Sequence, residues 1–304
     1  MAKKEEPLVS VPVITYNSAK TVLETLESIK AQTYPNIELI VSDDCSTDDT
    51  VAICHQWIER NKNRFVRTEV ITVKQNTGVS ANCNRASNAI QGQWVKGIAG
   101  DDILLPKCIE TYVKYVAEHP DAVYIFGKVD VFGDNEDTIN RFVNTIFDYS
   151  FFSLSSEEQY KWLITRSFQP IPAATEFYNY YKVKALGITN DSRIPMLEDW
   201  PKWIRCMEKG VRFHFVDQVI ARYRVSGSVS ICSGTQYSES FRRSLALMYI
   251  YYQYKPAIKY KGLYLSTLKY VHCKYIVENN LFWHIVDYLL RKPNRLFRKQ
   301  DDFY

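Results

Sequence analysis

Three pairs of adjacent carboxylates are the residues of this sequence that could most readily do chemistry. They are Asp43–Asp44, Asp101–Asp102 and Glu198–Asp199. Each pair alone has an ordinary structural explanation as a turn or a helix N-cap, and Asp199 precedes Pro201, a residue favoured in a first helical turn. If all three pairs met in space, their negative charges would repel one another unless a cation or a reaction made use of them.

A divalent cation bound to a diphosphate would explain such a cluster. Mg²⁺ and Mn²⁺ take one or two protein carboxylates and complete their coordination with phosphate oxygens and water. The sequence has no Walker A loop and no GxGxxG motif that could bind phosphate in another way. Its five histidines lack the spacing of a metal site, so ordinary packing is favoured for them. We therefore expect a Mg²⁺ or Mn²⁺ site among the carboxylates.

The first half of the sequence alternates between apolar runs and amphipathic segments. Strands are predicted at residues 8–16, 37–41, 68–73 and 94–99. Helices are predicted after Ser18 as an N-cap, after a Ser46–Asp49 capping box, at residues 80–90 and at residues 106–118. This alternation predicts an α/β fold with a mostly parallel sheet and helices on both faces. Ligands of such sheets lie beyond the carboxyl ends of the strands, where the first two acidic pairs fall.

The pattern changes after a strand predicted at residues 122–131. Residues 133–156 are polar and irregular, with an aromatic cluster of Phe147, Tyr149, Phe151 and Phe152. Later elements are predicted as a helix at 157–165, a strand at 174–178, a helix at 201–209 and a strand at 211–223. Beyond residue 237 the pattern indicates helices interrupted at Pro256 and Pro293. We expect three segments, residues 1–133, 134–236 and 237–304.

Composition and charge argue against several classes of protein. The seven cysteines are scattered and form no CxxC pair, which argues against a disulfide framework or a zinc site. The sequence shows neither a signal peptide nor an apolar run long enough to span a membrane, so we expect a cytoplasmic protein. Residues 251–304 hold 10 of the basic residues against 4 acidic ones. A basic tail on an otherwise balanced chain disfavours nucleic-acid binding and indicates a local contact with an anionic surface.

Five segments, in this order, resemble family 2 glycosyltransferases. They are VSVPVITYN (9–17), IELIVSDDCSTDDT (37–50), QNTGVSANCNRA (75–86), AGDDILLP (99–106) and LEDWPKWIR (197–205). The resemblance is strong over residues 8–133 and weaker as far as residue 230. It implies a GT-A nucleotide-diphospho-sugar transferase fold with a C-terminal helical extension. Residues 1–133 would then bind the donor, residues 134–236 would carry the acceptor side and the catalytic base, and residues 237–304 would form the extension.

The resemblance also assigns roles to residues. It places Thr15, Tyr16 and Asn17 along the nucleotide, Asp43 or Asp44 at the base or ribose, and Asn76, Gly78 and Asn84 in the donor site. Asp102 matches the direct ligand of Mn²⁺ or Mg²⁺, with Asp101 as a second metal candidate that lies nearer the ribose or sugar. Asp199 matches the catalytic base and Glu198 its acidic companion.

Three departures from the family pattern affect these roles. Ala99 replaces the first Asp of the metal motif, so metal binding depends on two carboxylates. Cys83 stands where many relatives have Arg before the position of Asn84. Ser226 replaces the His of a Tyr-Arg-x-His motif, which removes a candidate ligand of the metal or diphosphate. The degree of metal dependence is therefore open at this point.

The implied reaction is an inverting transfer from a nucleoside-diphosphate sugar, with a UDP-sugar favoured, to a hydroxyl of a saccharide or lipid-linked acceptor. Surface-polysaccharide synthesis is the implied context. Two alternatives stay open: a nucleotidyltransferase that makes sugar nucleotides, and a non-catalytic module that binds them. The first should have a Gly- and Arg-rich phosphate loop near the first strand, which residues 15–18 do not supply. Retention of Glu198–Asp199 argues against the second.

The tail combines an apolar, aromatic segment with a basic one. The apolar residues are Leu281, Phe282, Trp283, Ile285, Val286, Tyr288, Leu289 and Leu290, and the cations that follow are Arg291, Lys292, Arg295, Arg298 and Lys299. Such a segment could lie on an anionic membrane as a peripheral contact. The alternative is that it packs on the catalytic domain or on a second subunit in a homodimer.

Overall fold

The computed structural model describes residues 6–134, 136, 139, 147–166, 171–225 and 238–291. A nine-stranded sheet runs in the order β3-β2-β1-β4-β8-β7-β9-β6, with β5 paired to β1. The strands are β1 (Val9–Thr15), β2 (Ile37–Asp43), β3 (Arg67–Ile71), β4 (Trp94–Val95), β5 (Ile98–Ala99), β6 (Ile103–Leu104), β7 (Tyr124–Phe132), β8 (Phe177–Asn179) and β9 (Phe213–Arg224).

Strands β1 to β5 form the parallel part of this sheet. Every residue of β2 is buried, which explains why its sequence is a nearly continuous apolar run rather than an alternating one. The register pairs Val9 with Ile37 and Thr15 with Asp43, so β1 and β2 end side by side. The predicted parallel sheet is confirmed, and the expected strand at residues 94–99 is two short strands, β4 and β5.

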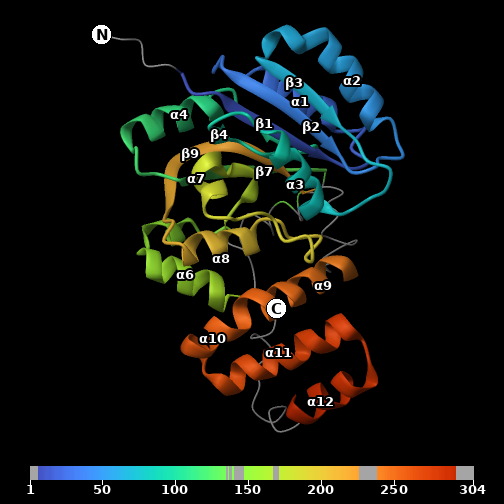
Figure 1. Cartoon of the computed structure of the whole chain (residues 1–304), viewed down its shortest axis with the longest axis vertical. Coiled ribbons are helices and arrows are strands. Elements are labelled where there is room, and N and C mark those ends of the chain that lie inside the picture. The colour runs from blue at the N-terminus through green and yellow to red at the C-terminus, as the bar shows by residue number, and fades with distance from the viewer. Residues whose placement is uncertain are drawn as a thin grey trace.

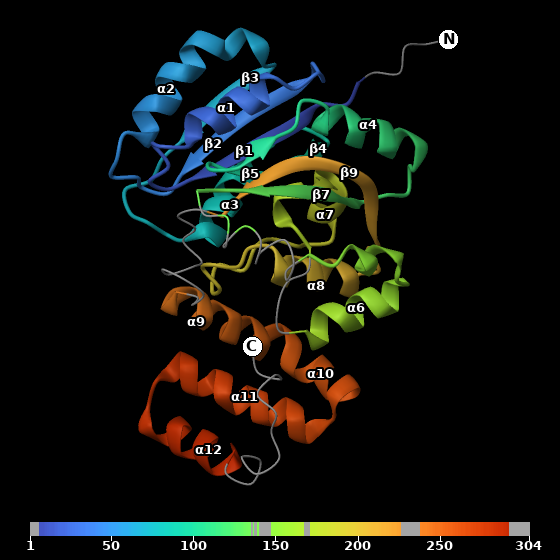
Figure 2. The same ribbon diagram turned by 180° about the vertical axis from the view of Figure 1, so that it is seen from behind.

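Helices cover both faces of the sheet (Figures 1 and 2). One face packs against α1 (Val22–Lys30), α2 (Thr50–Asn61) and α4 (Cys108–Glu118). The other packs against α6 (Ser156–Thr165), α7 (Tyr180–Ala185) and α8 (Trp200–Glu208), and α3 (Val79–Ala89) also lies against β1 and β2. The two faces therefore have separate hydrophobic cores, and the sheet edge between them is where the strand-end loops meet.

The second half of the chain extends the same sheet with mixed polarity. Strand β8 is antiparallel to β4 and β7, whereas β9 runs parallel to β7. The strand expected at residues 174–178 is displaced, because Ala173–Thr175 forms a 3-10 turn before β8 begins at Phe177. Since β7 and β9 are parallel, their carboxyl ends lie together and bring Arg224 next to Phe132 in the register.

The C-terminal helices form a layer beyond α6 and α8, as both views show (Figures 1 and 2). They are α9 (Glu239–Met248), a π-helix (Tyr249–Gln253), α10 (Tyr254–Lys261), α11 (Leu263–Glu278) and α12 (Leu281–Arg291). The chain stays helical through Pro256, and the departure from regular α-helix comes just before it, as the π-helix over Tyr249–Gln253 that leads into α10. The chain turns instead at Gly262, whose φ is +79°.

Two predicted helix caps are also wrong. Helix α1 begins at Val22 after Thr21, and the Ser18 carbonyl, not its side chain, accepts the first N–H groups. Helix α2 begins at Thr50, and Ser46 does not cap it, because the Ser46 hydroxyl donates to Asp43 at 2.5 Å. Both serines belong to the strand-end loops rather than to the helices that follow. Within the described residues, none of the helices combines the length and apolar character needed to cross a membrane.

Candidate active site

The carboxyl ends of β1 and β2 fix Asp43 beneath the loop that follows β1. Its carboxylate accepts the Thr15 hydroxyl at 2.9 Å and the Ser46 N–H at 2.8 Å, in addition to the Ser46 hydroxyl. Ser46 in turn accepts the Asn17 N–H at 2.7 Å. Asn17 has a positive φ of 52° and is stabilised there by the Thr47 N–H, which donates to its side-chain oxygen at 2.8 Å. Thr15, Asn17 and Asp43 are therefore one connected group.

Asp44 organises the turn before α3. Its carboxylate accepts the N–H groups of Thr77 and Gly78 at 2.9 and 2.7 Å, the Thr77 hydroxyl at 2.6 Å and the Arg85 guanidinium at 2.5 Å. Burial alone would raise the pKa of Asp44, but these hydrogen bonds outweigh it and hold the pKa below its ordinary value. The Asn76 amide also donates to the Asp44 carbonyl, at 3.3 Å. Asp44 thus fixes the predicted donor turn in one conformation.

Gly78 and Asn84 attach α3 to the loop that precedes Glu198 and Asp199. Gly78 has a φ of +88°, and a Cβ there would lie 2.9 Å from the Pro195 Cβ. The close approach that requires glycine in the structure is thus to Pro195. Asn84 exchanges two hydrogen bonds with the Asn190 backbone, at 2.9 and 3.0 Å. Tyr16, by contrast, extends outward and is 42% exposed.

Helix α1 and strand β9 hold the Asp101–Asp102 loop from opposite sides. The Thr25 hydroxyl donates to the Asp102 carbonyl at 2.8 Å. The Arg224 N–H donates to the Asp102 carboxylate at 2.9 Å, and the Arg224 guanidinium donates to the Asp101 carbonyl at 2.9 Å. A Cβ on Gly100 would lie 2.8 Å from Thr15, so glycine is needed to bring this loop against the end of β1.

The electrostatic state of Asp101 and Asp102 differs from that of Asp44. Burial, reinforced by the charge of Asp101, raises the pKa of Asp102 well above its ordinary value. Burial also raises the pKa of Asp101, although Arg224 opposes the shift. Two hard oxygen ligands with an unfavourable shared charge fit a divalent cation that brings further ligands with it. Within the part of the chain that the structure describes, no group of three or more His, Cys, Asp or Glu residues could hold a metal by itself.

Glu198 and Asp199 stand at the start of α8. Asp199 is 7% exposed and caps this helix, accepting the Trp200 N–H at 2.6 Å, so the predicted cap is confirmed. Burial and the adjacent charge of Asp199 raise the pKa of Glu198 to about 8. At neutral pH this pair therefore retains a proton that two separate carboxylates would have lost.

Tyr223, on β9, is near both the Asp101–Asp102 pair and the Glu198–Asp199 pair. Burial raises the pKa of its phenol, and the negative charges of Asp102, Asp101, Asp199 and Glu198 raise it further. Tyr223 therefore lies within electrostatic range of both the second and the third acidic pairs.

Comparison with known proteins agrees with this arrangement. The family model described as Glycosyl transferase family 2 matches residues 10–171, more than half of the chain. The chain belongs to glycosyltransferase family 2. The match covers most or all of the first four of the five sequence motifs, and the chain is a glycosyltransferase rather than a nucleotidyltransferase or a non-catalytic module.

Relatives extend over most of this glycosyltransferase. An uncharacterized glycosyltransferase of Methanocaldococcus jannaschii is 25% identical over 95% of this chain and 89% of its own length. The Escherichia coli enzyme UDP-Glc:alpha-D-GlcNAc-diphosphoundecaprenol beta-1,3-glucosyltransferase WfaP is 27% identical over 79% of this chain and 85% of its own.

Solved structures share the GT-A fold. S. aureus TarS 1-349 in complex with UDP-GlcNAc has a TM-score of 0.60 and 21% identity, covering 87% of this chain and 73% of that one. The Pyrobaculum calidifontis mannosyltransferase PcManGT, in complex with GDP-Man and Mn²⁺, has a TM-score of 0.57 and 17% identity, covering 97% and 77%. The predicted fold class is therefore confirmed.

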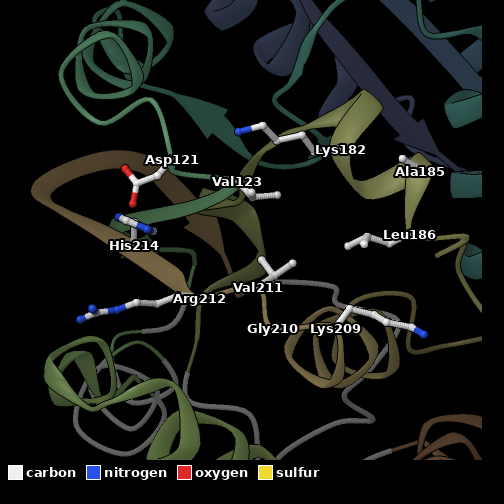
Figure 3. Close-up of a pocket in the computed structure, with 10 residues that line it drawn as sticks. All are labelled: Asp121, Val123, Lys182, Ala185, Leu186, Lys209, Gly210, Val211, Arg212 and His214. Atoms are coloured by element: carbon white, nitrogen blue, oxygen red, sulfur yellow. The ribbon is translucent and has the colours of Figure 1, made fainter.

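A separate pocket of about 530 Å³ lies at the other end of the sheet (Figure 3). Its lining includes Val123 and His214, which lie at the amino ends of β7 and β9. Two of the acidic pairs lie at the carboxyl ends of β2 and β5, and the third lies in the loop just before α8. Figure 3 shows the charged ends of Lys182, Lys209 and Arg212 spread around a central apolar surface. This pocket is not part of the candidate active site.

Sequence reasoning missed several residues of the site. They are Tyr223, Arg224, Lys96, Glu176 and Lys202. Lys96 is fully buried, and its ammonium donates to the carbonyls of Gly97 and Ala174 at 2.6 and 2.8 Å. The sequence does not indicate this role, because a single lysine within an apolar strand segment belongs to no recognisable motif. Tyr223 and Arg224 belong to the same short motif as Ser226, which lies outside the described residues, and their spacing along the chain does not indicate contacts with residues more than 100 positions away.

Proposed function

We propose that this glycosyltransferase transfers a sugar, with inversion, from a UDP-sugar to a hydroxyl of a saccharide or lipid-linked acceptor in surface-polysaccharide synthesis. The convergence of Asp101–Asp102 and Glu198–Asp199 around Tyr223 supports the proposal, because it provides a site for the leaving diphosphate next to a base for the incoming hydroxyl. Relatives and neighbours whose names include UDP-Glc and UDP-GlcNAc support the choice of nucleotide.

Asp199 acts as the general base in this proposal. One of its oxygens caps α8, which fixes the carboxylate, and its loop is attached to α3 through Asn84 and Asn190. The acceptor hydroxyl attacks the anomeric carbon while Asp199 takes its proton, and the bond to the diphosphate breaks. Glu198 accompanies Asp199, and because its pKa is raised it holds a proton at neutral pH, which leaves Asp199 as the carboxylate that can accept one. A single displacement of this kind inverts the anomeric configuration.

Asp102, with Asp101 as the second candidate, would hold Mn²⁺ or Mg²⁺. When bound, such a cation stabilises the charge on the departing diphosphate. Thr15, Asn17 and Asp43 form the floor for the nucleoside, and Tyr16 is exposed beside them. Asp44, Asn76, Gly78 and Asn84 shape the wall between that floor and the Glu198–Asp199 loop.

The test is a panel of nucleotide sugars, with release of the nucleoside diphosphate measured in Mn²⁺ and in chelator. Asp199→Asn should lower turnover about 10²-fold or more while donor affinity is retained, because the amide can cap α8 but cannot take a proton. Asp191→Asn is the matched control, since it removes a carboxylate from the same loop and should leave turnover within a few-fold. Full activity of Asp199→Asn would assign the base to another residue.

We also propose a cytoplasmic enzyme that contacts an anionic membrane through its tail. Helix α12 exposes Leu281, Phe282, Ile285 and Tyr288, whose spacing places them along one helical stripe. The side chains of Leu289, Leu290 and Arg291, and all residues from Lys292 onward, including Arg295, Arg298 and Lys299, lie outside what the structure describes. A lipid-linked acceptor confined to the membrane plane would make this attachment useful.

Sedimentation with liposomes tests the membrane proposal. The intact protein should co-sediment with anionic vesicles at low salt, and deletion of residues 281–304 should abolish this binding while donor binding is retained. Phe282→Ser should weaken binding, whereas Val66→Ser, which changes an equally exposed apolar residue near β3, should not. Equal sedimentation with neutral vesicles, or a concentration-dependent dimer that the deletion abolishes, would favour simple packing or a homodimer.

A further inference from the structure

Lys202 is a buried lysine beside the proposed catalytic pair. Its side chain is 7% exposed, and its ammonium pairs with the Glu176 carboxylate at 2.8 Å. The ammonium also lies 5.1 Å from the centre of the Tyr178 ring and 6.0 Å from that of Tyr124, within the range of cation–π attraction. These contacts hold the cation in one place.

Glu176 is held just as firmly from its other side. Its second oxygen accepts the Tyr124 hydroxyl at 2.8 Å and the Trp203 indole N–H at 3.1 Å. Burial would raise the pKa of Glu176, but the charge of Lys202 and these hydrogen bonds keep it below its ordinary value. Lys202 and Glu176 therefore form a fixed, ionised pair inside the protein.

The lysine of this ion pair lies in the same helical turn as the Glu198–Asp199 pair. Lys202 follows Asp199 by three residues and so belongs to the first turn of α8 that Asp199 caps. The charges around Glu198 are those of Asp199 and Lys202 on α8 and Glu176 before β8. The neutral titratable groups nearby are the Cys83 thiol on α3 and the Tyr223 phenol on β9.

The charges acting on Glu198 have opposite signs. Asp199 and Glu176 disfavour its ionised form, whereas Lys202, four residues further along in the first turn of α8, favours it. Without Lys202, the Glu198, Asp199 and Glu176 carboxyls would lose the cation that pairs directly with Glu176.

We propose that Lys202 is a positioning residue whose fixed positive charge sets the protonation of the Glu198–Asp199 pair. The negative charge of Glu176 partly offsets the effect of Lys202 on that pair. The inference rests on the proposed function of that pair as the proton acceptor. It makes the pH range of transfer depend on an ion pair whose two side chains are largely buried. A purely structural ion pair would affect stability and leave that pH range unchanged.

Two substitutions that break the same ion pair distinguish these cases. Lys202→Met removes the positive charge and should move the titration of Glu198 to higher pH, by about one pH unit. Glu176→Gln removes the negative charge and should move it to lower pH. The Lys202→Met/Glu176→Gln double variant leaves no unpaired buried charge, so it should fold well and titrate closer to the wild type.

The readout is ¹³C NMR of glutamate carboxyls, with the Glu198 signal assigned by its loss in Glu198→Gln. This readout needs no substrate, so it stays informative if the proposed reaction is wrong. The pH profile of kcat/KM, measured with the UDP-sugar that the panel identifies, should move in the same two directions. Lys202→Arg, which retains the charge, should retain the wild-type profile.

Arg67→Met is the matched control for breaking a buried ion pair far from the site. Arg67 pairs with the buried Glu38 at 3.0 Å between β3 and β2. This variant should lose stability but leave the titration of Glu198 and the pH profile of kcat/KM unchanged. Shifts of Lys202→Met and Glu176→Gln in the same direction, or no shift in either, would overturn the proposal.

Discussion

Carboxylates in two parts of the site have pKa values shifted in opposite directions. Before α3, Asp44 accepts hydrogen bonds from Thr77, Gly78 and Arg85, and its pKa is lowered. After β5 and before α8, burial and neighbouring negative charge raise the pKa values of Asp102 and Glu198. The difference teaches that acidic pairs alike in sequence can have opposite electrostatic states. The first is satisfied by the protein itself, whereas the others need a cation or a proton from elsewhere.

The largest effect should come from Asp102→Ala. Removing the proposed ligand leaves the diphosphate charge uncompensated, so transfer should fall by about 10³-fold or more, and nucleoside diphosphate should bind more weakly in Mn²⁺. Activity and equilibrium binding measure the two losses. Asp130→Ala, which removes an exposed carboxylate paired with Arg222, is the control and should change little. Wild-type rates for Asp102→Ala, or full activity in chelator, would contradict the metal proposal.

Asp44→Asn should affect folding more than chemistry. The amide cannot accept all the donors that converge on Asp44, so we expect a loss of about 2–4 kcal/mol in the free energy of unfolding. Because the folded pKa of Asp44 is lowered, its contribution is present above the ordinary carboxyl pKa and disappears as the pH falls through the folded value. Denaturant titrations at pH 7 and pH 3 should therefore show a smaller difference from the wild type at pH 3.

Glu198→Gln should show the reverse dependence on pH. With a folded pKa of about 8, Glu198 binds a proton in the folded state that the unfolded chain has lost, so stability declines as the pH rises from its ordinary carboxyl pKa to about 8. The glutamine cannot ionise, so the variant should gain in Tm over the wild type, and more at pH 9 than at pH 6. An equal gain at both pH values would show that Glu198 does not titrate in this range.

The smallest effect should come from the contact between the C-terminal helices and the loop of the catalytic pair. Tyr252, in the π-helix, donates to the Asp191 carboxylate at 2.7 Å. Tyr252→Phe should cost about 1 kcal/mol of stability and leave the kinetics of transfer nearly unchanged, since Asp191 also pairs with Arg193. A large loss of turnover instead would show that the extension helps to position Asp199.

Much of the fold could be predicted from local pattern. Buried strands such as β2 and amphipathic helices such as α8 follow from apolar spacing, and a parallel sheet then places Asp43 and Asp102 at one edge. The failures concern polar side chains with competing partners. Ser46 had the sequence of a helix cap, but Asp43 and the Asn17 N–H were nearer, and no local rule could rank these choices.

The sequence by itself determined the acidic pairs, their positions after strands and before α8, and the family. Only the tertiary structure decided which positively charged side chains lie near these acidic residues. Arg224 reaches Asp102 across 122 positions of the chain because β9 pairs with both β6 and β7. Lys202 contacts Glu176 because α8 packs against the sheet in the same hydrophobic core as β8, and Glu176 directly precedes β8. The physical reason is that protonation depends on burial and distance, which arise from packing between segments remote in sequence and not from the spacing of residues along it.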